Sequence, residues 1–96
     1  MLTAEEYASR VAAVQRLGLD AIRSERSVWR SEGLVIVDDR TRGLYEGRPL
    51  LLRQLTAVSG SQVMSLVFRF VEPSDEPALL AESASIAAGW RLVPER

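Results

Sequence analysis

The alternation of apolar and polar residues divides the chain into helical and extended stretches. Near the start, apolar residues recur every three or four positions, the spacing that gathers them on one face of a helix. This pattern predicts a helix over residues 3–17. Thr3 and Glu6 have the spacing of a capping box, and Gly18 stands where a helix commonly ends with a left-handed residue.

The stretch from Asp20 to Arg30 is polar, with isolated apolar residues, and its pattern fits two structures. In one, the helix continues to about Glu25. In the other, a twisted strand follows a short turn. The sequence leaves both open, because neither the helical nor the alternating period is sustained.

Two short strands are predicted on either side of an acidic pair. Residues 34–37 form a β-branched run typical of a buried strand, after a turn at Glu32-Gly33. We expect Asp38-Asp39 to end that strand in a solvated turn, and residues 41–45 to form the next strand. Glu46-Gly47 then has the composition of a tight hairpin turn, in which glycine supplies a positive φ.

The strongest strand signals lie at residues 50–58 and 62–71, separated by Ser59-Gly60-Ser61. In the second of these strands, alternate residues share a face, and one face is wholly apolar. That face, which we expect to meet the core, consists of Met64, Leu66, Phe68 and Phe70.

A second helix is predicted after a proline-rich break at residues 73–77. Ser74 is the candidate N-cap, and residues 78–88 are rich in alanine and leucine. Gly89 is placed to end this helix. Residues 90–93 then fit a short last strand that Pro94 stops.

The order of these elements predicts an α+β fold for one domain over residues 1–96. An antiparallel β-meander is flanked by an N-terminal helix and a C-terminal helix, followed by the short last strand.

Composition removes several classes of chemistry. The chain has no cysteine and no histidine, so thiolate metal sites, disulfides and histidine-based catalysis are excluded. No phosphate-binding loop or nucleophile motif is present, so we expect a protein that is not an enzyme and has no cofactor. Asp38-Asp39 could ligate a cation, but the neighbouring arginines favour the solvated turn.

Charge and hydropathy argue against a nucleic acid or a membrane as the partner. The net charge is −1, which gives no field to attract a polyanion. Arg23, Arg26 and Arg30 with Trp29 resemble a surface for single-stranded nucleic acid, but acidic residues dilute that patch. No apolar run is long enough to span a bilayer, and the acidic start differs from a signal peptide, so we expect a cytoplasmic protein.

A surplus of apolar strand surface points instead to a protein partner. Leu50-Leu51-Leu52 makes both faces of one strand apolar, so one side needs cover from a helix or from another chain. We therefore expect a homodimer that binds a protein client. The candidate partner-binding residues are Leu50, Leu52, Met64, Phe68 and Trp29.

Several segments together resemble the PsbP-like/DcrB family. They are the opening helix with Tyr7, the run from Gly47 to Gln54, the strand ending in residues 66–70, and Trp90-Arg91-Leu92 after the second helix. The resemblance implies an antiparallel sheet between helices and a role in protein binding. One branch of that family comprises chaperones that shield apolar segments of type VI secretion effectors as dimers. A weaker resemblance is to the class I chaperones of type III secretion.

Two functions follow as hypotheses. The first is a secretion-effector chaperone or adaptor that shields an apolar client segment. The alternative is an assembly subunit whose sheet edge pairs inside a larger complex.

Overall fold

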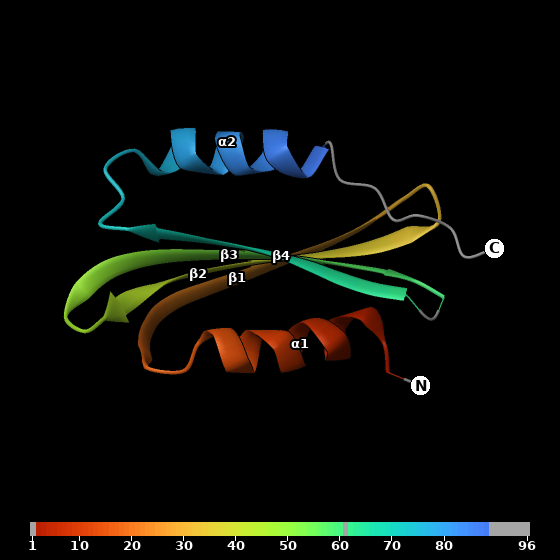
Figure 1. Ribbon diagram of the computed structural model, residues 1–96, viewed down its shortest axis with the longest axis horizontal. Helices are drawn as coiled ribbons and strands as arrows, with labels where there is room; N and C mark the ends of the chain where they lie inside the picture. Colours follow the sequence, from red (N-terminus) through yellow and green to blue (C-terminus); the bar gives the residue numbers. More distant parts are fainter. Residues whose placement is uncertain (1, 61, 89–96) are drawn as a thin grey trace.

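An antiparallel sheet lies between two helices in the computed structural model, which describes residues 2–60 and 62–88 (Figure 1). The α+β fold expected from the sequence is confirmed. The elements are α1 (Ala4–Gln15), β1 (Leu19–Ser31), β2 (Leu34–Tyr45), β3 (Arg48–Ser59), β4 (Gln62–Val71) and α2 (Glu76–Ala88).

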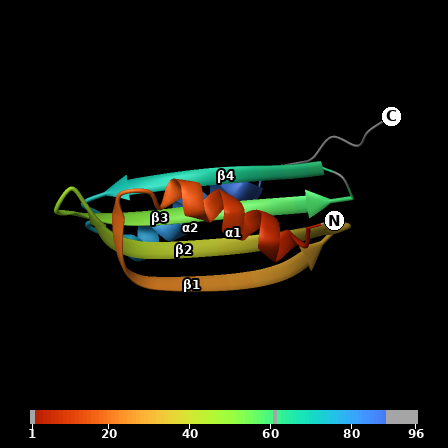
Figure 2. The ribbon, with the colours of Figure 1, turned by 90° about the horizontal axis from the view of Figure 1, so that it is seen from below.

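The four strands follow one another in the sheet in chain order, β1-β2-β3-β4 (Figure 2). Two-residue turns join the first three. In Glu32-Gly33 and Glu46-Gly47, both residues have positive φ, between 50° and 79°. Positive φ at both positions defines the type I′ turn, whose twist matches that of the flanking strands. Both turns predicted from the sequence are therefore confirmed.

The structure shows that residues 20–30 form a strand, and it corrects the prediction made for Asp38-Asp39. β1 covers Leu19–Ser31 without helical continuation. β2 runs unbroken from Leu34 to Tyr45, so the prediction that Asp38-Asp39 ends a strand in a solvated turn was wrong. Both carboxylates are buried, at 2% and 3% exposure. They remain in the strand because arginines on neighbouring strands pair with them.

The strand register sorts side chains onto two faces. Asp38 lies opposite Leu55 and Asp39 lies opposite Gln54, and adjacent residues of a strand point to opposite faces. Gln54 contacts α1 and defines the α1 face, whereas Arg53 contacts α2 and defines the α2 face. Figures 1 and 2 show one helix on each face.

α1 begins as the sequence predicts. The Thr3 hydroxyl accepts a hydrogen bond from Glu6 N at 3.1 Å, and Thr3 N donates to Glu6 Oε1 at 3.2 Å. The helix ends at Gln15, earlier than expected, and Gly18 follows with a φ of 78°. Its buried residues are Ala4, Ala8 and Ala12, a stripe of small side chains that lets the helix axis lie close to the sheet.

α2 starts at Glu76 and is capped by Asp75 rather than by the expected Ser74. The Asp75 carboxylate accepts a hydrogen bond from Ala78 N at 3.2 Å. Among the described residues of α2, only Ser83 is buried. The expected cap at Gly89, the short strand over 90–93 and Pro94 lie outside the described residues.

The centre of the molecule is β3, where every residue from Leu50 to Ala57 is buried. β4 is an edge strand and is less covered. Of its apolar face, Leu66, Phe68 and Phe70 are half-buried, and Met64 is 37% exposed. That face meets the core only in part, because β4 lies at the edge of the sheet.

We expect Gly43→Ala to destabilise the protein by about 1–3 kcal/mol. A Cβ atom at this position would lie 2.4 Å from the backbone oxygen of Asp20 in β1, next to the irregularity between Ala21 and Arg23. Backbone cannot yield as a flexible side chain can. Urea unfolding would measure the loss, and a Gly43→Ala chain as stable as the wild type would contradict this close approach of the two strands.

Candidate protein-binding groove

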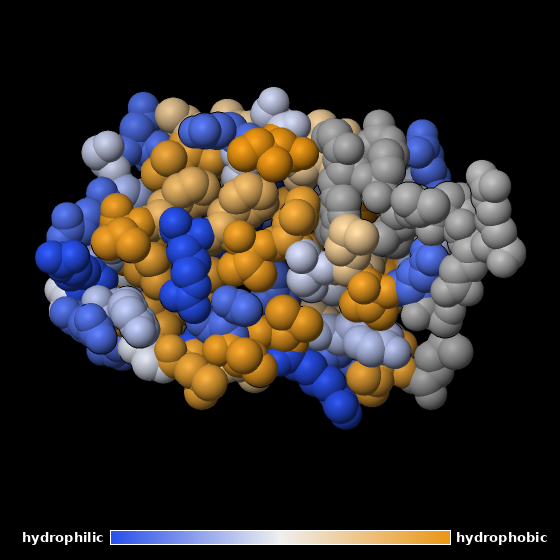
Figure 3. All heavy atoms as spheres, viewed as in Figure 1, coloured by the Kyte–Doolittle hydropathy of each residue, from blue (hydrophilic) through white to orange (hydrophobic). Residues whose placement is uncertain are grey.

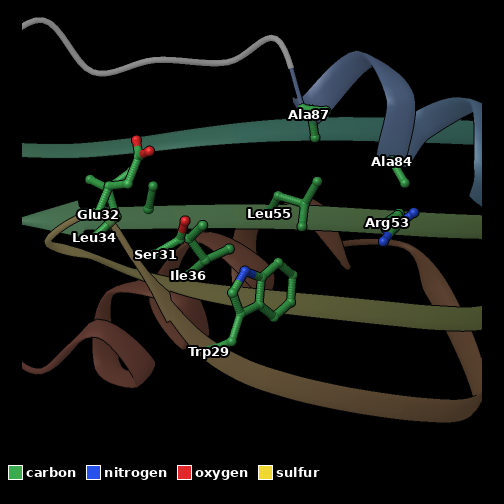
Figure 4. Close-up of a pocket in the computed structure, with 11 residues that line it drawn as sticks. Trp29, Ser31, Glu32, Leu34, Ile36, Arg53, Leu55, Ala84 and Ala87 are labelled. Atoms are coloured by element: carbon green, nitrogen blue, oxygen red, sulfur yellow. The ribbon is translucent and has the colours of Figure 1, made fainter.

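A groove with a volume of about 390 Å³ lies on the α2 face, beside the last turns of α2 (Figure 4). Its floor comes from three strands and one wall comes from the helix. Among the residues that the structure describes, those that line it are Trp29, Ser31, Glu32, Leu34, Ile36, Arg53, Leu55, Ala57, Ala84, Ala87 and Ala88.

The groove is mostly apolar, and its polar groups stand at its rim. Trp29, Ile36 and Leu55 come from β1, β2 and β3, and they point into the space below α2 (Figure 4). The helix offers only alanine methyl groups here, so it leaves room between itself and the sheet. Trp29 stays 41% exposed although it is large and apolar. An exposed aromatic next to an apolar hollow is typical of a surface that another molecule covers.

Arg53 closes one end of the groove and ties α2 to the sheet. Its Nε and Nη2 donate to the two oxygens of Asp38 at 3.1 and 2.8 Å. Its Nη1 donates to the Leu80 carbonyl at 2.8 Å and to the Ser83 hydroxyl at 2.7 Å. Arg40 donates to Asp38 Oδ2 at 2.8 Å as well. The buried Asp38 carboxylate therefore fixes the Arg53 guanidinium, which in turn binds α2 through Leu80 and Ser83.

A second polar set ties α1 to the opposite face. Arg26 donates to both oxygens of Asp39, at 2.6 and 3.0 Å, and this pairing raises the pKa of Arg26. The buried Gln54 amide donates to the Ala8 carbonyl at 3.0 Å and to Thr56 at 3.1 Å. Arg26 also donates to the Glu5 carbonyl of α1 at 3.4 Å, so the two adjacent aspartates of β2 pair with arginines that contact different helices.

Arg42 joins three elements at the start of α2. Its Nε donates to Glu76 Oε1 at 2.6 Å, and Nη2 contacts the same oxygen. Its Nη1 donates to Glu25 in β1 at 2.8 Å. The Arg42 guanidinium holds the pKa of Glu76 below its ordinary value, chiefly through the hydrogen bond.

This ion pair predicts a loss of stability in acid. A carboxylate whose pKa is lowered in the folded state adds stability above its unfolded pKa, and that stability is lost as pH falls through the folded value. We expect the midpoint of urea unfolding to fall below about pH 4.5 more steeply in the wild type than in Glu76→Gln. Equal slopes of both proteins over that range would contradict the pairing. Glu72→Gln, next to Arg48 at 3.7 Å and exposed, is the control.

The structure brings some of the sequence-predicted partner-binding residues to the surface and buries others. Trp29 lines the groove, and Met64 and Phe68 lie on the same face along β4. Leu50 and Leu52 lie on the other face at 4% and 2% exposure, so no partner reaches their side chains in this conformation. Leu51 is also buried, so the apolar surplus at residues 50–52 is enclosed by the protein itself.

The arginines around Trp29 do not form one patch. Arg23 and Trp29 are on the α2 face, whereas Arg26 lies on the α1 face and is paired with Asp39. Arg23 is paired with Glu25 at 3.3 Å. Within residues 2–60 and 62–88, no three acidic side chains converge in a way that would hold a metal ion.

Sequence reasoning missed Ile36, Leu55 and Ala84 as groove residues. Ile36 and Leu55 belonged to apolar runs that read as core, and Ala84 read as a packing position. The available signal was the alternation of side chains between the two faces. Trp29 lies opposite Ile36, and Ile36 lies opposite Ala57, which shares its face with Leu55 two positions away. Using it requires the register, which the sequence did not supply.

Comparison of the chain with protein-family models, with curated proteins and with solved structures finds no match. The described helices include none that is long and apolar enough to cross a membrane. The site must therefore be interpreted from its own geometry.

Proposed function

We propose that the protein binds an apolar segment of another protein in the groove on the α2 face, without catalysing a reaction. The observation that carries this proposal is the apolar lining around a half-exposed tryptophan. Trp29, at 41% exposure, and the half-buried Ile36 offer apolar surface to water beside the buried Leu55, at the position where α2 presents only alanine. Covering such surface is favourable by roughly 25 cal/mol for each Å² removed from water.

The shape and chemistry of the groove favour a helical peptide segment over a small metabolite. A metabolite site needs convergent polar groups that fix orientation. Among the described residues that line the groove, the one buried charged side chain, Arg53, is already engaged by Asp38, Leu80 and Ser83. Apolar grooves bordered by a helix commonly accept the apolar face of an amphipathic helix.

The resemblance to effector chaperones supports a more specific version of this proposal. In that version the protein is a cytoplasmic adaptor that shields an apolar client segment until the client is exported. Support comes from the apolar groove and from the sheet held between helices, which is the fold that the resemblance implies.

Isothermal titration calorimetry with a synthetic helix of leucine and alanine, carrying lysines at both ends, tests the proposal. We expect binding with a negative heat-capacity change, the mark of apolar burial. A peptide of the same length and charge, with serine in place of leucine, is the control. Equal heats for both peptides, or no binding of the apolar one, would contradict the proposal.

A second candidate function, assembly by strand addition at a sheet edge, rests on a different observation. β4 is an edge strand with one charged residue, Arg69, in its ten-residue length. β1, the other edge, carries several charges and an irregularity between Ala21 and Arg23. Charges and bulges protect edges from pairing, so β4 is the edge open to strand addition in an assembly.

A further inference from the structure

We infer that β4 pairs antiparallel with β4 of a second copy of this chain, about a twofold axis at Val67. This rests on the second candidate function and narrows edge pairing to one occupant. It does not depend on the groove, which lies over β1, β2 and β3.

One backbone hydrogen bond shows which backbone groups of β4 point outward. Glu72 N donates to the Pro49 carbonyl at 2.8 Å, and these residues continue the register that pairs Leu50 with Val71. Bonded and non-bonded pairs alternate along an antiparallel ladder. The even-numbered residues therefore bond to β3, and the backbone groups of the odd-numbered residues point outward. Those residues are Val63, Ser65, Val67, Arg69 and Val71.

No described strand occupies that outer side. Among residues 2–60 and 62–88, the sheet ends at β4. Valines at this edge are partly exposed: Val63 by 38%, Val67 by 36% and Val71 by 59%. Figure 3, which has the same view as Figure 1, shows apolar side chains gathered between the two helices on the face along β4. An edge that is long and apolar is a template for another strand.

β4 is complementary to itself in one register. A twofold axis perpendicular to the sheet places the α1 faces of both copies on the same side. Residues paired across the axis must therefore both be odd-numbered or both be even-numbered. With the axis at Val67, this residue meets its own copy, Val63 meets Val71, and Ser65 meets Arg69. All outward backbone groups then form bonded pairs across the axis.

The charge pattern supports a second copy in this register. Arg69 is the only charged residue of β4, and the register places it opposite a serine rather than opposite another arginine. On the α2 face, Leu66 of one copy meets Phe68 of the other, an apolar pair. An axis at Leu66 would instead place Val63 opposite Arg69. The resulting dimer joins the two four-stranded sheets into one.

Light scattering after size exclusion, over a range of protein concentrations, gives the first test. We expect a dimer of the wild-type chain and a dissociation constant raised on the order of a hundredfold by Val67→Lys, because two lysines then meet on the axis. Val28→Lys is the matched control: Val28 is an exposed valine on the α1 face of the other edge strand. It should leave the dimer unchanged.

Site-specific cross-linking gives the second test, and the chain offers a clean background because it has no cysteine. Val67→Cys should be cross-linked to a covalent dimer by a short bis-maleimide, whereas Val28→Cys, whose thiols lie far from the twofold axis, should form no covalent dimer under the same conditions. A wild-type chain that is monomeric at every concentration overturns the inference. So does a dimer that Val67→Lys leaves intact or that Val28→Lys weakens equally. Peptide calorimetry on the same samples reports on the groove separately.

Discussion

Asp38→Leu is expected to destabilise the protein by about 3–5 kcal/mol, because it leaves the buried Arg53 guanidinium without its carboxylate partner. Arg53 is 8% exposed, and its two contacts to Asp38 satisfy the charge that the Leu80 carbonyl and Ser83 hydroxyl cannot neutralise. Arg40 loses the same carboxylate but is closer to water, with its side chain 20% exposed. Urea unfolding followed by circular dichroism measures the change.

The double variant Asp38→Leu/Arg53→Met separates the stranded charge from simple loss of packing. Replacing both members of a buried ion pair by apolar residues is often neutral or stabilising. We therefore expect the double variant to be more stable than Asp38→Leu alone. Glu72→Leu, at an exposed ion pair, should change stability by less than about 1 kcal/mol. If Asp38→Leu lowers stability as little as Glu72→Leu does, the contacts between Asp38 and Arg53 do not hold α2 on the sheet.

Ala84→Arg is expected to weaken binding of the apolar peptide more than tenfold while leaving the fold intact. Ala84 is exposed and lines the groove, so a long side chain is tolerated by the helix and extends into the space that the peptide needs. Arginine also has a high helix propensity, so α2 should not be weakened.

Ser85→Arg is the matched control for this variant. Ser85 is the next residue of the same helix turn, is exposed, and is not part of the groove lining. It adds the same charge and bulk on the side of α2 away from Ser83 and the sheet. Equal affinities of Ala84→Arg and the wild type would exclude the groove as the binding site. Equal losses in both variants would point to charge repulsion instead.

The elements that the sequence predicted well are those fixed by local chemistry. The capping box of Thr3 and Glu6 and the turns at Glu46-Gly47 and Glu32-Gly33 depend on residues a few positions apart. The alternation over residues 62–71 places side chains by parity alone. Such signals need no knowledge of the rest of the chain.

The acidic pair shows why the remainder was not predictable. Two adjacent aspartates favour a turn on local grounds. In the fold, Asp38 meets Arg53 and Asp39 meets Arg26, partners that are 15 and 13 positions away in the sequence. Their burial depends on three strands being in register, so no window of local sequence contains the cause.

Only part of the candidate site was predictable from the sequence. Trp29 was singled out as a possible anchor and lies in the groove, whereas Leu50 and Leu52 were selected for their apolar character and lie under α1. Apolar character alone does not distinguish a core strand from an exposed one. β3 is central and β4 is at the edge because of strand order, which local patterns do not encode.

The proposed function requires an apolar segment of a partner to occupy the groove next to Trp29. The chain has two tryptophans, so Trp90→Phe leaves Trp29 as the sole indole reporter. Titrating this variant with the leucine–alanine peptide should shift the tryptophan emission to the blue in a saturable way, because Trp29 passes from partial exposure to an apolar contact. An emission spectrum that stays unchanged while calorimetry records full binding would contradict the claim.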